Sequence, residues 1–84
     1  MTNSPILEKL TLILREVFDD EALVATAELS AHKVDGWDSL GNVRLFIEIE
    51  RAFHVRFSAP EISSLKNVGQ LANLIERKIQ HTTP

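Results

Sequence analysis

The chain has 84 residues and no cysteine, and this combination limits what it can fold into. A domain of this size buries only roughly 60% of its unfolded surface and cannot form a disulfide or a thiolate metal site, so its apolar core must hold it together alone. Hydrophobic residues make up 44% of the sequence and charged residues 25%, as in folded globular proteins. We therefore expect one small domain over residues 1–84, with a core over about 5–79 and a frayed tail at 80–84.

Apolar residues recur every three or four positions in three segments, which predicts three amphipathic helices. The first spans about 5–18, with Ser4 as N-cap and Pro5 at the first helical position. The second spans about 39–53 after Asp38 as N-cap, and the last spans about 68–79 after Asn67. The predicted core stripes are Ile6, Leu10, Ile13, Leu14 and Val17 in the first helix, Leu40, Val43, Phe46, Ile47, Ile49 and Phe53 in the second, and Val68, Leu71, Leu74, Ile75 and Ile79 in the last.

A short helix is predicted over about 59–65, because Ser58 and Glu61 form the spacing of a capping box. The stretch that precedes the second helix lacks sustained periodicity, which indicates a long ordered loop with at most one short helical turn. No hairpin signal lies between alternating apolar runs. The predicted fold class is therefore all-α: a small bundle of three longer helices and one short helix, with a long loop before the second helix.

The residues that usually carry catalysis do not gather in this sequence. His32, His54 and His81 lie in three separate segments, and no phosphate-binding glycine loop or pair of histidines at helical spacing is present. We therefore predict no catalytic residue and no metal site. The net charge of −3 disfavours nucleic acid as a partner. No apolar run approaches the roughly 18 residues of a membrane span, so we expect a cytoplasmic protein without membrane insertion.

Ser39 stands at the predicted start of the second helix, directly after the long loop, in the segment Gly36-Trp37-Asp38-Ser39-Leu40. An Asp-Ser pair at this place is a common capping sequence, so a purely structural role is one interpretation. A hydroxyl here also lies at the positive end of the helix dipole, where unpaired backbone N–H groups favour a phosphate. Both interpretations are open on these residues alone.

This segment resembles the attachment motif of the acyl carrier protein family, in which Asp-Ser-Leu opens the second helix. Asp38-Ser39-Leu40 matches that tripeptide. The resemblance covers about residues 6–79 and needs no gap after the serine. Other residues that follow the family's spacing are Val43, Leu45, Ile49, Glu50, Phe53, Phe57, Leu65, Asn67 and Val68.

The resemblance implies that Ser39 accepts 4′-phosphopantetheine from coenzyme A through a separate phosphopantetheinyl transferase. Asp38 and Leu40 complete the motif, with Asp38 as N-cap and as a contact to the metal or basic groups of the transferase. The thiol of the arm holds acyl groups as thioesters and presents them to acyl-loading and acyl-processing enzymes of fatty acid or polyketide biosynthesis. We expect a monomeric carrier that is a substrate of the transferase and not itself an enzyme.

The predicted second helix departs from the pattern of fatty-acid carriers, which usually place acids along this helix. Gly41 follows the motif, and Arg44 and Arg51 stand further on. This predicts a docking surface of mixed charge and a dedicated carrier in a specialised pathway. The alternative is a solvated face with a pair between Arg44 and Glu48 at i, i+4. The residues predicted for docking are Trp37, Arg44, Glu48 and Arg51.

The aromatic residues are predicted to be mainly structural. Trp37 is expected at the boundary between the loop and the bundle, where it also meets the arm or a partner if docking uses this edge. Phe46, Phe53 and Phe57 are expected in the core, because phenylalanine at helical spacing is usually buried. Bundles of the resembling family hold acyl chains between their helices, and these rings would narrow that space.

Two other functions agree with the same sequence. An aminoacyl or peptidyl carrier would share the fold, the serine and the cofactor. A helical interaction domain without modification, in which Ser39 is only a residue of the capping region, is an alternative of another class. A nucleic-acid-binding domain is disfavoured further, because residues 41–84 carry six basic and four acidic residues, an excess of only +2.

Overall fold

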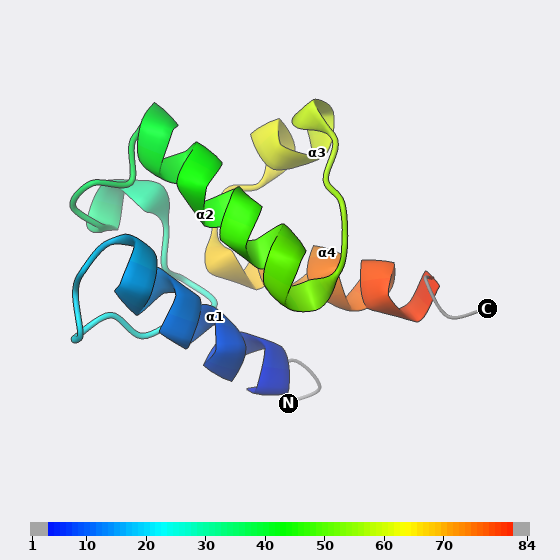
Figure 1. Ribbon diagram of the computed structural model, residues 1–84, viewed down its shortest axis with the longest axis horizontal. Coiled ribbons are helices and arrows are strands. Elements are labelled where there is room, and N and C mark those ends of the chain that lie inside the picture. Colours follow the sequence, from blue (N-terminus) through cyan, green and yellow to red (C-terminus); the bar gives the residue numbers. More distant parts are fainter. Residues whose placement is uncertain (1–3, 82–84) are drawn as a thin grey trace.

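The computed structural model describes residues 4–81, and in this range it contains helices and no strand (Figure 1). The all-α prediction, with three longer helices and one short helix, is confirmed. α1 begins at Ser4, the residue predicted as its N-cap, and α4 ends at His81, so most of the predicted tail lies outside the described residues. The helices are α1 (Ser4–Val17), the 3₁₀ helix η1 (Ala31–Lys33), α2 (Ser39–Phe53), α3 (Ala59–Ser64) and α4 (Val68–His81).

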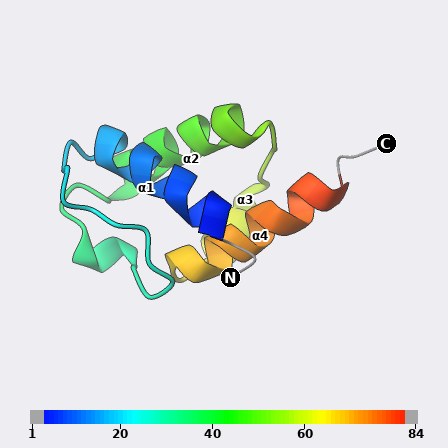
Figure 2. The ribbon, with the colours of Figure 1, turned by 90° about the horizontal axis from the view of Figure 1, so that it is seen from below.

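One apolar core joins α1, α2 and α4. α1 packs against both α2 and α4, and the short α3 lies beside the other two longer helices (Figures 1 and 2). Most of the stripe predicted for α1 is buried, and Ile13 is half-buried at its edge. Within the described residues, no helix has the length and apolar character needed to cross a bilayer. The buried core consists of Ile6, Leu10, Leu14, Val17, Ala25, Leu45, Phe46, Ile49, Val68, Leu71, Ala72 and Ile75.

The stripe predicted for α2 is partly wrong. Leu40, Val43 and Ile47 are 69%, 56% and 46% exposed, and Leu45 is fully buried in their place. The helix turns its Leu45, Phe46 and Ile49 side toward α1, and this leaves a second apolar row on the outside. A sequence with apolar residues on both sides of a helix does not say which side faces the core.

Two further phenylalanines that were predicted as core residues lie at its edge. Phe53 and Phe57 are half-buried and pack against the core. A lysine ammonium lies over each ring, with Lys9 Nζ 5.1 Å from the Phe53 centroid and Lys78 Nζ 5.3 Å from the Phe57 centroid. Such contacts stabilise a partly exposed ring by about 0.5–1 kcal/mol.

The long loop is ordered and bound to α1. Arg15 Nε donates to the carbonyl oxygen of Leu23 at 2.7 Å, and the N–H of Ala25 donates to Thr11 Oγ1 at 2.9 Å. Ala25 is buried in the core. The loop therefore gains hydrogen bonds and apolar burial that offset the loss of backbone entropy on ordering it.

The same loop also completes the start of α4. The N–H groups of Val68 and Gly69 donate to the carbonyl oxygens of Leu29 and Ala27 at 2.8 and 3.0 Å. The first turn of a helix has no internal partners for these donors, so the loop supplies acceptors that α4 needs. The 3₁₀ turn η1 follows and leads back toward α2 (Figure 2).

The predicted caps of α3 and α4 are confirmed. Ser58 Oγ accepts from the Glu61 N–H at 3.2 Å, Glu61 Oε1 accepts from the Ser58 N–H at 2.9 Å, and Asn67 Oδ1 accepts from the Gln70 N–H at 2.8 Å. Glu61 also pairs with Lys78 of α4 at 2.9 Å. The hydrogen bond from the Ser58 backbone, followed by Lys78, lowers the pKa of Glu61. This link between α3 and α4 is therefore present above the ordinary pKa of glutamate and is lost as the pH falls through the lowered one.

The two sides of α2 allow a matched test of the packing. Leu45→Ala removes a fully buried side chain and should lower the free energy of unfolding by about 2–5 kcal/mol. Leu40→Ala removes the same atoms from an exposed position and should change it by no more than about 0.5 kcal/mol. Urea denaturation of both variants measures the difference. Equal losses would contradict the assignment of the buried face.

Candidate functional site

Ser39 is the first residue of α2, and the residue before it caps the helix. Asp38 has extended backbone angles (φ −103°, ψ −163°), and its Oδ1 accepts from the Gly41 N–H at 2.9 Å. The Asp38 carbonyl oxygen accepts from the Asn42 N–H at 2.8 Å, which starts the helical hydrogen-bond ladder. The predicted N-cap is confirmed, and it fixes the place where Ser39 leaves the loop.

The side chain of Ser39 is accessible at this helix end. Ser39 and the following Leu40 are both exposed. Among the described residues, no acceptor lies within hydrogen-bond reach of the backbone N–H groups of Ser39 and Leu40. An exposed hydroxyl next to free N–H donors at the positive end of a 15-residue helix suits a covalently attached anion.

Gly41 lets the preceding loop lie against the first turn of α2. A Cβ on Gly41 would collide with the carbonyl oxygen of Gly36 and approach Phe18 Cε1 to 3.0 Å. Gly36 itself has a φ of +88°, which L residues rarely adopt, and this angle turns the chain back toward α2. The position of Ser39 therefore depends on two glycines that permit this close approach.

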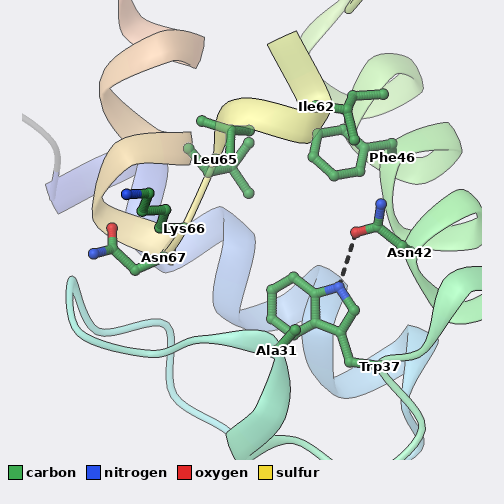
Figure 3. A pocket seen from close by; sticks show the side chains of 9 residues that line it. Ala31, Trp37, Asn42, Phe46, Ile62, Leu65, Lys66 and Asn67 are labelled. Carbon is green, nitrogen blue, oxygen red and sulfur yellow. Dashed lines mark hydrogen bonds between the residues drawn. The ribbon is translucent and has the colours of Figure 1, made fainter. Parts of the chain in front are cut away.

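Trp37 closes the junction between the loop and α2, as predicted for a boundary residue. Its half-buried ring stacks on Phe18 with centroids 5.5 Å apart and planes inclined by 28°. Its Nε1–H donates to Asn42 Oδ1 at 2.9 Å (Figure 3). The indole is held on one face by Phe18 and at its polar edge by Asn42.

A pocket of about 70 Å³ lies behind this tryptophan, between the start of α2, α3 and the start of α4. Trp37 and Asn42 lie on one side, and Phe46, Ile62 and Leu65 lie across from them (Figure 3). The remaining lining residues are Ala31, Lys66, Asn67 and Leu71.

The histidines do not form a catalytic arrangement. His32 lies in η1, where its ring is 3.4 Å from Ser30 Oγ, and His54 ends α2 in the left-handed region with φ 56° and ψ 48°. The side chain of His81 lies outside the part of the molecule that can be described. No group of acidic or histidine side chains suited to a metal ion occurs within residues 4–81.

The residues predicted for docking lie on α2, but the expected pair between Arg44 and Glu48 is replaced by other contacts. Arg44 Nη2 donates to the carbonyl oxygen of Val17 at 3.4 Å, and Glu48 pairs with Arg51 at 3.6 Å. The Arg51 side chain is 75% exposed, so this i, i+3 pair contributes little to stability.

Two residues of this region were not recognised as important from the sequence. Gly41 was treated only as a missing acid, although a glycine in the first turn of a helix costs about 1 kcal/mol relative to alanine and signals close packing. Asn42 carried no signal, because its partner Trp37 is set by the path of the loop and not by helical spacing.

Comparison with solved structures gives two similar chains. The solution structure of a holo acyl carrier protein from Geobacter metallireducens matches with a TM-score of 0.86 and 43% sequence identity, over 92% of this chain and 88% of that one. The crystal structure of an acyl carrier protein from Thermotoga maritima matches with a TM-score of 0.84 and 22% identity, over 99% of this chain and 96% of that one, and supports the fold. Neither a protein-family model nor a curated protein sequence matches the chain.

The contact at Gly41 can be tested by a single methyl group. Replacing glycine by alanine inside a helix ordinarily stabilises it by about 0.5–1 kcal/mol. Gly41→Ala should instead destabilise the protein by about 1–3 kcal/mol, because the new Cβ displaces Gly36 and Phe18. Urea denaturation measures the stability, and emission from Trp37, the one tryptophan of the chain, reports the displaced loop. A more stable variant with unchanged emission would contradict the close approach.

Proposed function

The chain belongs to the acyl carrier protein family, so it is a carrier protein and not an enzyme, and we propose that Ser39 is its attachment site for 4′-phosphopantetheine. The observation that carries this proposal is the exposed Ser39 hydroxyl at the capped start of α2, within Asp38-Ser39-Leu40. The similarity to a holo acyl carrier protein over most of the chain supports it. The proposal treats the whole chain as a single carrier domain, and its cytoplasmic location and monomeric state remain predictions.

The residues at the start of α2 suit a phosphodiester. The Ser39 Oγ can take the phosphate in open solvent, and the free N–H groups of Ser39 and Leu40, together with the helix dipole, favour the negative charge. Asp38 keeps its capping bond to Gly41, and its exposed position leaves the carboxylate within reach of a docked transferase.

The chain's own residues orient the site and leave the activation of the hydroxyl to the partner. The described histidines lie in η1 and at the C-terminal end of α2, so activation of Ser39 falls to the transferase. When attached, the arm supplies the thiol that this cysteine-free chain lacks, and that thiol holds the acyl group. A tether of this kind replaces bimolecular encounter by a high effective concentration at a docked enzyme.

A thiol count tests the attachment. The protein should have no reactive thiol before treatment and one per chain after incubation with coenzyme A and a broad-specificity phosphopantetheinyl transferase. Ser39→Ala should abolish this thiol, whereas Ser63→Ala, which removes another exposed helical hydroxyl, should retain it. Intact mass and a thiol reagent measure the outcome. Equal thiol in Ser39→Ala and the unaltered protein, or none in either, would contradict the proposed site.

Ser39→Ala should also leave the fold intact. The hydroxyl is exposed, and the cap is made by Asp38, so the free energy of unfolding should change by less than about 1 kcal/mol. Urea denaturation checks this. A variant that is unfolded under native conditions would favour the purely structural role of Ser39.

We further propose that partner enzymes dock on the outer face of α2, which we define as Leu40, Val43, Arg44, Ile47 and Arg51. Its apolar row is exposed although the side chains could have been buried, and Arg51 extends beside it. A row of apolar side chains with basic flanks suits a partner surface with an apolar centre and acidic rim. This charge pattern supports a dedicated carrier in a specialised pathway.

Charge reversal on this face tests the choice of partner. Arg44→Glu/Arg51→Glu should be used better than the unaltered protein by a transacylase of fatty-acid synthesis that binds acidic carriers, by about tenfold at low salt. The gain should shrink toward 1 M salt, where the Debye length is about 3 Å. Lys33→Glu/Arg77→Glu changes the net charge equally, away from α2, and should have little effect. Equal effects of the two double variants would contradict docking on α2.

A further inference from the structure

The start of α2 that carries Ser39 also forms one wall of the enclosed pocket. Trp37 lies two residues before Ser39 and Asn42 three residues after it, and both line the pocket together with Phe46 on the next turn (Figure 3). An arm attached to Ser39 therefore begins next to this pocket. The opposite wall comes from α3 and the segment that leads into α4, through Ile62 and Leu65.

The pocket is small. Its volume is about 70 Å³. An apolar cavity of about 150 Å³ holds benzene, a group of six carbons, so about 70 Å³ corresponds to roughly three carbons. An extended chain of eight carbons does not fit unless a wall moves.

The walls are held by specific contacts. Trp37 is fixed by its hydrogen bond to Asn42 and by stacking on Phe18, so its ring cannot turn aside without losing both. On the other side Phe46 packs edge-to-face on Phe57, with centroids 5.1 Å apart. The Trp37–Asn42 hydrogen bond is the one polar contact among these, and it spans the edge of the pocket nearest to Ser39 in the sequence (Figure 3).

On the basis of the function proposed above, we infer that this pocket receives acyl groups of about three carbons and that the Trp37–Asn42 hydrogen bond excludes longer chains. Longer chains on the arm stay in solvent. The two residues thus determine the size of the cargo that the carrier shelters, and they do so without contact to the attachment chemistry at Ser39. A carrier with this limit suits enzymes that load short acyl groups.

Two acyl groups distinguish the inference from free access. The transferase is supplied with propionyl-coenzyme A or octanoyl-coenzyme A, so that each acyl arm is placed on the protein in one step and checked by mass. In the unaltered protein the propionyl group should show nuclear Overhauser contacts to Phe46 and Leu71 and should alter Trp37 emission, whereas the octanoyl group should do neither. Hydroxylamine should cleave the propionyl thioester at least threefold more slowly than the octanoyl thioester, relative to the same coenzyme A thioesters.

Three variants test the role of the hydrogen bond. Trp37→Phe keeps a ring but removes the donor, and Asn42→Ala removes the acceptor, so both should admit the octanoyl group and slow its cleavage at least threefold. Asn42→Asp keeps an oxygen acceptor for the indole N–H and should exclude the octanoyl group as the unaltered protein does. Amide spectra of the variants confirm the fold before the acyl groups are compared.

Each result decides the inference. Octanoyl contacts to Phe46 or Leu71 in the unaltered protein, or no propionyl contacts there, would overturn the size limit. Octanoyl exclusion that persists in Trp37→Phe and Asn42→Ala would overturn the role of the hydrogen bond. A chain that accepts no arm overturns the function proposed above and this inference together, whereas a loaded chain without discrimination overturns this inference alone.

Discussion

Burial of one set of apolar side chains holds α1, α2 and α4 together, and the rest of the structure depends on it. Leu10, Leu14, Leu45, Ile49 and Ile75 are buried to within 1% of their surface, and the chain has no cysteine to supplement them. In a domain of this size, the loss of one such side chain removes a large part of a stability of about 5–15 kcal/mol. Secondary contacts, such as the link between α3 and α4, build on helices that this core has already placed.

The loop before α2 converts that core into a functional surface. It gives carbonyl oxygens to the start of α4 and then passes so close to the first turn of α2 that only glycine fits at position 41. The same path places Trp37 against Asn42. The cap of α2, the exposure of Ser39 and the wall of the pocket are therefore three results of one loop conformation. A change that displaces the loop should affect all of them together.

The outer face of α2 shows what the fold leaves unburied. Leu40, Val43 and Ile47 have the size and polarity of core residues, yet α1 already covers the opposite side of the helix. Exposed apolar rows of this kind have a cost in solubility and are typical of surfaces that bind partners. In a carrier that visits several enzymes, such a row offers apolar contact, and the arginines beside it bias the charge of the surfaces it can meet.

The sequence by itself determined what local physics controls. Helical spacing, Asp38 and the Ser58–Glu61 box predicted the helices to within one or two residues at most ends, and Asp38-Ser39-Leu40 indicated the candidate site, because propensity, periodicity and capping act over a few neighbouring residues. Only the tertiary structure decided which side of α2 is buried, why position 41 is glycine and where Trp37 lies. These depend on contacts between segments brought together by folding, and two apolar rows on one helix are equivalent until a neighbouring helix covers one of them.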